Sequence, residues 1–188
     1  MATKPGERKA QILQTLAEML EDPKGERITT ALLAAKVDVS EAALYRHFSS
    51  KAQMFEGLIE FIESTVFSLI NKITAEETSG VKQIEAIITM LLGFAKKNPG
   101  MTRVLIGDAL VHENEKLQAR INQLHDRLEA TLRQSLRLAA SVSEIPNNTD
   151  ITTKANVLLC YVIGRWHQFA KSGFKRSPTE YWPAQFRE

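Results

Sequence analysis

One stretch, ITTALLAAKVDVSEAALYRHFSSK at residues 28–51, constrains the fold most, because two short helical patterns meet there at a tight break. Thr29 or Thr30 can cap the first pattern and Ser40 the second, since their hydroxyls accept from free backbone N–H groups. Asp38 lies in the break between two valines, and aspartate tolerates the left-handed conformation that such a turn needs. The stretch therefore predicts two helices joined by a turn, the helix-turn-helix arrangement whose second helix enters the DNA major groove.

A plain pair of antiparallel helices fits the same periodicity, so the pattern alone leaves both interpretations open. The order of residues is more specific: Thr-Thr, Leu-x-Ala-Ala, Val-x-Val-Ser, Leu-Tyr-Arg-His-Phe and Ser-Lys follow one another. This order resembles the DNA-binding domain of the TetR family of bacterial regulators. The strings SEAALYRHF and KAQMFEGLIEFIE resemble its nucleoid occlusion branch in particular. The resemblance covers most of the chain and weakens after about Ser141. Asp38 stands where the family usually has Gly, and Ser49 where it usually has Pro.

Composition restricts the class of protein but does not identify a partner. The 188 residues are 44% hydrophobic and 24% charged, which is typical of an ordinary globular protein. The net charge is +2, and residues 1–51 carry eight Lys/Arg against seven Asp/Glu, so charge alone does not indicate nucleic-acid binding. No apolar run reaches the roughly 18 residues of a membrane span. With a single cysteine, Cys160, the chain has no internal disulfide, and we expect a cytoplasmic protein. The resemblance implies that it is nucleoid-associated.

The periodicity predicts an all-α fold in two parts, a helix-turn-helix domain at 1–50 and a helical dimerisation and partner-binding domain at 51–188. A helix at about 7–21 supplies the third wall of the first domain. We expect further helices at about 51–73, 81–97, 101–111, 113–140 and 152–171. The helix at 152–171 is apolar almost all round, which suits either a central core helix or pairing with the 113–140 helix and a second subunit. The resemblance implies the homodimer.

The helix at 51–73 carries two adjoining apolar lines rather than one. The first line is Met54, Leu58, Phe61, Thr65 and Leu69, and the second is Phe55, Ile59, Ile62, Val66, Ile70 and Ile73. At 3.6 residues per turn they are rotated by roughly 80–100° from each other. One line can pack inside the bundle, and the other either widens that burial or faces a partner.

The residues expected to contact DNA are Arg27, Thr29, Thr30, Ser40, Tyr45, Arg46, His47 and Lys51. Thr29, Thr30 and Lys51 lie at helix N-termini, where backbone N–H groups attract phosphate. Tyr45 could instead seal the motif, and Arg46 could pair within the domain; the resemblance implies phosphate or base contact for Tyr45. A dimer predicts a roughly palindromic site on double-stranded DNA.

Three functions compete for the second domain. The resemblance implies a DNA-activated inhibitor of FtsZ ring assembly over the chromosome, whose partner surface comprises Phe61, Leu69, Met90, Gly93, Lys97 and Asn98. Relative to that branch, Lys97 replaces an arginine and Leu69 a basic residue. A ligand-responsive transcriptional repressor is the alternative, although we find no convergent polar groups to orient a ligand. Phe61 and Met90 could also simply pack within the bundle.

An enzyme is the third function, and the sequence gives it little support. There is no glycine-rich phosphate loop, the four histidines are scattered, and no spacing predicts a metal site. We interpret His125-Asp126 and the Asp108/His112 pair as surface residues and Cys160 as a small buried hydrophobe. We therefore expect neither cofactor nor metal, and no small-molecule ligand.

Overall fold

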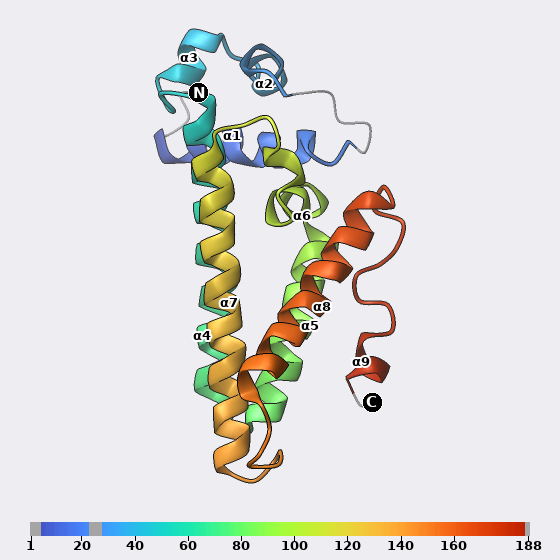
Figure 1. Cartoon of the computed structure of the whole chain (residues 1–188). Helices are drawn as coiled ribbons and strands as arrows, with labels where there is room; N and C mark the ends of the chain where they lie inside the picture. The colour runs from blue at the N-terminus through green and yellow to red at the C-terminus, as the bar shows by residue number, and fades with distance from the viewer. Residues whose placement is uncertain (1–4, 23–27, 187–188) are drawn as a thin grey trace.

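The computed structural model describes residues 5–22 and 28–186, which are helical apart from their connections (Figure 1). Arg27 lies outside these residues. The helices are α1 (Pro5–Met19), α2 (Thr30–Val37), α3 (Glu41–Tyr45), α4 (Lys51–Glu76), α5 (Gly80–Lys97), α6 (Pro99–Leu105), the 3-10 turn η1 (Asp108–Leu110), α7 (Glu115–Ser141), α8 (Ile151–Lys171) and α9 (Trp182–Gln185). The all-α prediction is confirmed.

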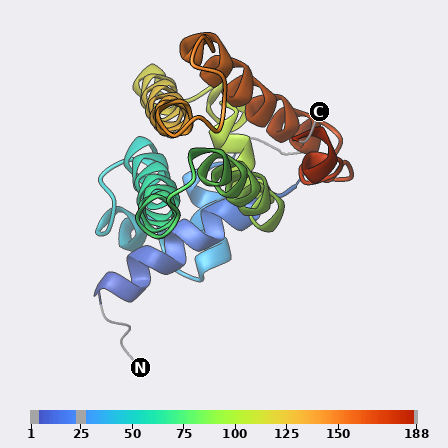
Figure 2. The same ribbon diagram turned by 90° about the horizontal axis from the view of Figure 1, so that it is seen from below.

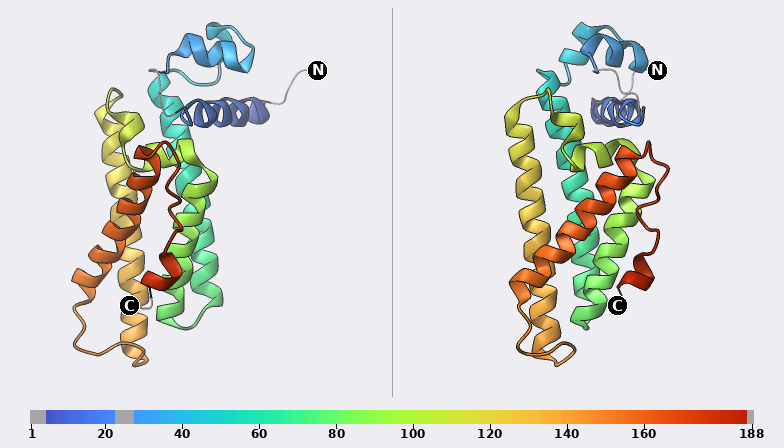
Figure 3. Two further views of the ribbon diagram at one scale, coloured as in Figure 1. Left: turned by 90° about the vertical axis from the view of Figure 1, so that its right-hand side faces the viewer. Right: turned by 45° about the vertical axis from the view of Figure 1, so that its right-hand side comes forward.

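The three N-terminal helices sit at one end of an elongated molecule, on the N-terminus of α4 (Figure 1). The other four long helices make two layers, with α4 beside α5 and α7 beside α8, as Figure 2 shows along the bundle. The two views of Figure 3 show α4 running from the N-terminal helices to the far end of the bundle. A single continuous helix therefore belongs to both parts of the molecule.

Side-chain caps set the ends of the short helices. The hydroxyl of Thr29 accepts from the Leu32 N–H at 3.2 Å, and that of Ser40 accepts from the Ala43 N–H at 3.2 Å. Ser50 caps α4 in the same way, at 3.1 Å from the Gln53 nitrogen. Asp38 ends α2 at φ 57° and ψ 52°, the left-handed conformation that its sequence position predicted.

The first apolar line of α4 divides into a buried and an exposed part. Met54 and Leu58 are fully buried, whereas Phe61 is 50% and Leu69 40% exposed. The second line is buried from Phe55 to Ile70. One line therefore packs inside the molecule, and half of the other remains at the surface instead of widening that burial.

A glycine determines how closely the two parts of the molecule approach. A Cβ placed on Gly100 in α6 would lie 1.9 Å from the Ala17 carbonyl oxygen of α1, so only glycine fits there. Beside it, the Arg103 guanidinium donates to the carbonyls of Leu20 and Asp22, both at 3.2 Å, and to Asp108 at 2.8 Å. Close backbone packing and a shared arginine therefore hold α6 against the end of α1.

Two expectations about helix ends were wrong, and one short helix was missed. The helix expected at 101–111 is divided into α6 and η1, because Gly107 adopts φ 77°. The helix expected from 113 begins at Glu115, because the Asn114 side chain caps it at 3.0 Å from the Lys116 nitrogen. The short helix α9 has too few residues for any periodicity to show.

Two residue assignments also need correction. Cys160 is exposed, because it lies on the outward side of α8 rather than on the side of Leu159 and Val162. His125 is not a surface residue: its Nε2 lies 2.9 Å from the Leu105 carbonyl oxygen. Burial lowers the pKa of the His125 ring, although this hydrogen bond and Asp126 oppose the shift.

Candidate nucleic-acid interface and partner face

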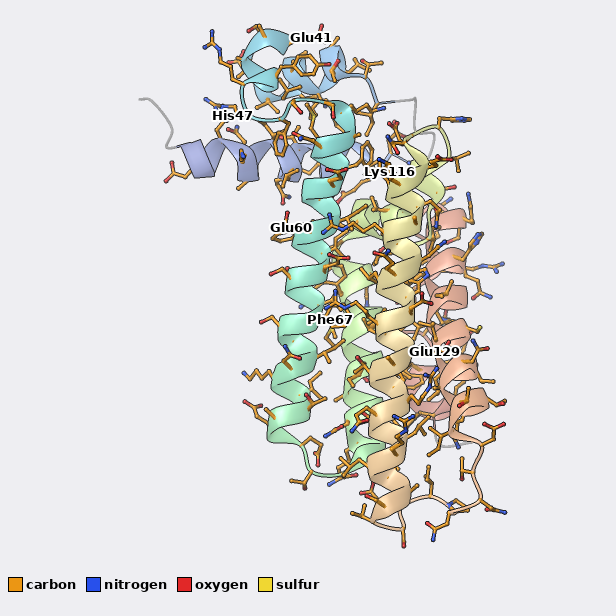
Figure 4. The ribbon with its side chains drawn as sticks, turned by 60° about the vertical axis from the view of Figure 1, so that its left-hand side comes forward. Glu41, His47, Glu60, Phe67, Lys116 and Glu129 are labelled. Carbon is orange, nitrogen blue, oxygen red and sulfur yellow. The ribbon has the colours of Figure 1, made fainter. Side chains whose placement is uncertain are left out.

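The outermost surface of the N-terminal part is formed by α3 and the residues that follow it. Tyr45 is 44% exposed, Arg46 is exposed, and His47 is partly buried at the end of the short helix. Figure 4 places Glu41 and His47 at this end of the molecule, away from the bundle. The surface therefore presents an aromatic hydroxyl, a cation and an imidazole on one exposed helix end.

A small hydrogen-bond network joins the two helices of the motif on that surface. The Thr30 hydroxyl donates to a Glu41 carboxylate oxygen at 2.7 Å and accepts from the Tyr45 hydroxyl at 3.4 Å. Thr30 and Tyr45, both predicted DNA contacts, thus bond each other directly, and Thr30 also bonds Glu41, which the sequence analysis did not single out. The Thr30 hydroxyl carries one proton, and in this structure that proton is donated to Glu41.

Thr29 and Ser40 remain at the surface while they cap their helices. Each hydroxyl oxygen already accepts one backbone N–H, and its own proton is available to donate. A cap that is exposed in this way can hold a helix N-terminus and contact a phosphate at the same time. Both predicted residues therefore lie where backbone contacts to DNA are geometrically possible.

Lys51 differs from the other predicted contacts. Its ammonium pairs with Glu113, in the connection between η1 and α7, and lies 5.7 Å from the centre of the Phe55 ring. The two side chains are 21% and 12% exposed, so the pair is largely sheltered from solvent. Sequence reasoning missed Glu113, because 62 residues separate it from Lys51 and nothing in its own segment marks it.

The predicted partner residues lie on α4 and α5. Because these two helices are antiparallel and joined by a short turn, Phe61 is level with Lys97, and Leu69 with Met90. Met90 and Gly93 are partly buried, and a Cβ placed on Gly93 would touch nothing within 4 Å. The Asn98 side chain donates to the Phe94 carbonyl at 2.8 Å. Phe61 and Leu69 are thus exposed on α4, and Gly93 leaves open space on α5.

A hollow adjoins this face at the junction with α1. It has a volume of ≈ 490 Å³ and is lined by residues of α1, α4 and α6 that include Leu13, Leu58, Phe61 and Met101. Phe61 therefore forms one wall of an apolar depression that the N-terminal part also shapes.

The outward side of the α7/α8 layer is a separate surface. Val157 is 60% exposed, Cys160 is exposed, and a Cβ on Gly164 would meet nothing within 4 Å. Beside them, Asn156 on α8 donates to Glu129 on α7 at 3.0 Å, and Glu129 accepts from Arg133 at 2.7 Å. This face combines small residues with a fixed polar network and points away from α4 and α5.

The part of the chain that the structure describes holds neither a metal-binding group of three or more His, Cys, Asp or Glu residues nor a helix long and apolar enough to cross a membrane. A further cavity, of ≈ 510 Å³, lies between α5, α7, α8 and α9. Apolar side chains line most of it, with Lys154 at its edge.

Both parts of the chain match models of one class of DNA-binding proteins. Residues 12–58 match the model described as bacterial regulatory proteins, tetR family. Residues 78–187 match that of the tetracyclin repressor-like, C-terminal domain. The chain belongs to the tetR family of bacterial regulatory proteins.

Within the family, the chain resembles one particular protein along its whole length. It is 54% identical to the nucleoid occlusion factor SlmA of Alteromonas mediterranea over 100% of this chain and 94% of that protein. It is 50% identical to the nucleoid occlusion factor SlmA of Marinomonas sp., over 99% of this chain and 94% of that protein.

Solved structures of other regulators share the fold at much lower sequence identity. The fatty acid degradation regulator FadR from Bacillus halodurans superposes with a TM-score of 0.79 at 14% identity, covering 100% of this chain and 95% of that one. The TetR family regulator PfmR from Thermus thermophilus gives 0.76 at 18% identity, over 94% and 95% of the two chains.

Proposed function

We propose that this protein is a nucleoid occlusion factor: a homodimer that binds specific DNA sites and, when bound, inhibits FtsZ ring assembly over the chromosome. The observation that carries the proposal is the continuous helix α4, which begins at the motif and exposes Phe61 and Leu69 further along. Its relatives named as nucleoid occlusion factors support the proposal over the whole chain. We expect the protein to act in the cytoplasm on the nucleoid, as a regulator rather than an enzyme.

For DNA binding, the supporting feature is the exposed end formed by α2 and α3. We expect Thr29, Ser40 and Lys51 to contact phosphates, which position a protein on the duplex, and Tyr45, Arg46 and His47 to contact base edges or the backbone. Arg27 precedes the same surface in sequence. With few base contacts on so short a helix, we expect phosphate contacts to supply most of the affinity.

For self-association, the supporting feature is the outward side of α7 and α8. Small residues around Gly164 allow two helices to approach closely, and a second copy would complete a four-helix interface. This surface is on the opposite layer from α4 and α5 (Figure 2). A dimer would therefore leave both partner faces accessible and space two motifs for a roughly palindromic site.

For the FtsZ contact, the supporting feature is the apolar surface around Phe61 and Leu69 with open space over Gly93. Two large apolar side chains on one exposed helix face are typical of an interaction site, and a glycine beside them lets a partner backbone come close. Lys97 at the upper end adds a cation that can pair with an acidic partner group.

A ligand-responsive repressor is the second candidate function, and one observation favours it. The cavity of ≈ 510 Å³ beneath α9 is within the size range of small-molecule sites. The regulator FadR from Bacillus subtilis, whose fold is similar, has been solved in complex with stearoyl-CoA.

A sedimentation experiment separates the two candidates. Polymerised FtsZ is mixed with the protein, with and without a palindromic duplex that the protein binds, and the pelleted FtsZ is measured. Nucleoid occlusion predicts that pelleted FtsZ falls only when the duplex is present. No effect of the duplex on FtsZ, together with release of DNA by a small apolar molecule, would instead support the repressor.

A further inference from the structure

Glu113 is in an unusual place for a residue that engages a DNA-binding helix. It lies in the connection between η1 and α7, in the second part of the molecule, yet its carboxylate pairs with the ammonium of Lys51. Lys51 is the first residue of α4, where backbone N–H groups and the helix dipole attract an anion. A DNA phosphate bound by Lys51 would therefore have to replace this carboxylate at the ammonium.

The low exposure of Lys51 and Glu113 gives their ion pair a measurable strength. At 21% and 12% exposure, the two side chains are screened less than a surface pair, so breaking the pair has a measurable cost. A phosphate that takes the ammonium leaves Glu113 with a negative charge next to the DNA backbone. Repulsion then favours movement of Glu113 away from the duplex.

The connection that carries Glu113 follows an anchored residue and borders a cavity. Asp108 in η1 is held by Arg103 and by Lys171 of α8, whereas Val111 is 71% exposed. A cavity of ≈ 290 Å³ lies directly behind, lined in part by Phe55, His112 and Glu113. Residues 111–114 therefore have free space on one side and a firm anchor before them.

We propose that Glu113 is a positioning residue that competes with DNA phosphate for Lys51, so that DNA binding releases the connection between η1 and α7. This inference rests on the proposed DNA binding and adds a route by which an occupied DNA site is sensed at the start of α7. Glu113 touches no DNA itself and acts only through Lys51.

A double-mutant cycle tests the competition. Affinity for the palindromic duplex is measured for the wild type, Glu113→Gln, Lys51→Ala and the double variant, with thermal unfolding to show that each is folded. Glu115→Gln is the matched control, because Glu115 is exposed two residues further on and its change removes the same charge. We expect Glu113→Gln to raise affinity about threefold to fivefold, the size of a modest ion pair, and Glu115→Gln to change it less than twofold.

The cycle distinguishes action through Lys51 from a general charge effect. In the Lys51→Ala background, Glu113→Gln should change affinity no more than Glu115→Gln does. An equal gain in both backgrounds would show a long-range charge effect and overturn the inference. A loss of affinity in Glu113→Gln would overturn it too, because Glu113 would then help Lys51 to bind DNA.

Hydrogen exchange tests the release of the connection. Adding duplex to the wild type should speed exchange of the amides at 111–114, and adding it to Lys51→Ala should not. Unchanged exchange in the DNA-bound wild type would overturn the release. A wild type that binds no duplex at low salt would instead overturn the proposed function itself, so the two failures are distinguishable.

Discussion

The two surfaces proposed to bind macromolecules are built differently. On the motif, the predicted DNA contacts are already engaged within the protein: Thr29 and Ser40 cap helices, Thr30 bonds Glu41, and Lys51 pairs with Glu113. On α4, Phe61 and Leu69 are instead exposed. A phosphate bound by Thr30 or Lys51 would therefore replace an existing polar contact, whereas a partner on α4 would only have to cover apolar area. We expect the first interaction to depend strongly on salt and the second much less.

The largest effect should come from the contact between α6 and α1, which fixes the two surfaces relative to each other. Gly100→Ala places a Cβ 1.9 Å from the Ala17 carbonyl oxygen, which forces α6 away from α1. We expect the free energy of unfolding to fall by about 3 kcal/mol, as for a severe overpacking change. Gly93→Ala is the matched control, because its Cβ meets nothing within 4 Å and should stabilise α5 by about 0.5–1 kcal/mol. Denaturant titration measures both, and equal stability of the two variants would contradict this account.

Binding of FtsZ to the surface of α4 and α5 should depend on the exposed ring of Phe61. Phe61→Ala should weaken binding of FtsZ to the DNA-bound protein by about 2 kcal/mol, roughly thirtyfold, if Phe61 is a central apolar anchor. DNA affinity should stay the same, since Phe61 is not part of α2 or α3, which carry the motif. Tyr181→Ala removes another exposed aromatic, at 61% exposure, and serves as the control. Fluorescence anisotropy with labelled FtsZ gives both values, and similar losses for the two variants would remove Phe61 from the contact.

Removing a phosphate contact from the motif should lower both the affinity for DNA and its dependence on salt. Lys51→Ala removes one phosphate contact, so the slope of log K against log salt should become shallower by about 0.9, and affinity should fall by about 1 kcal/mol on any duplex. Lys116→Ala removes a cation from α7 near the same end of the molecule (Figure 4) and should leave the slope unchanged. DNA affinity is measured over a salt series for both variants. An unchanged slope of log K against log salt in Lys51→Ala would exclude Lys51 from the phosphate contacts.

The stability of the protein should rise when Asp38 in the turn of the motif is replaced by glycine, without any change in the bundle. Asp38 adopts φ 57°, where a non-glycine residue is strained, so Asp38→Gly should raise the free energy of unfolding by about 0.5–1 kcal/mol. Asp38→Ala keeps the strain, loses the polar side chain and should be destabilising. Denaturant titration measures both variants. A destabilised glycine variant would mean that the Asp38 side chain matters more than its backbone.

The smallest effect should be a pH dependence of the free energy of unfolding that His125 of the bundle causes. Burial lowers the pKa of His125 below its ordinary 6.5, so below that pH the unfolded chain binds more protons than the folded one. The free energy of unfolding should therefore fall as the pH drops below about 6.5 and be unaffected by this residue above it. His125→Gln keeps an N–H for the Leu105 carbonyl but cannot take the proton, so its pH profile should be flatter over pH 5–6.5. Parallel profiles would exclude His125 as the cause.

Local features were predictable wherever a few neighbouring residues decide them. The caps at Thr29 and Ser40, the turn at Asp38 and the long helix from Lys51 all follow from side chains that bond their own backbone or repeat every 3–4 residues. The break at Gly107 and the short α9 were missed, because a single backbone angle and a four-residue helix leave no periodic trace. The predicted contacts on DNA and on FtsZ stay predictions.

The sequence by itself determined the long helices, the motif and the presence of a second apolar line on α4. Only the tertiary structure decided which half of that line is exposed, that Cys160 faces outward, and that Glu41 and Glu113 hold predicted DNA contacts. Helical periodicity reports which residues share a face but not which neighbour covers that face. Glu113 meets Lys51 across 62 residues because α7 returns beside α4, and no local pattern encodes such a meeting.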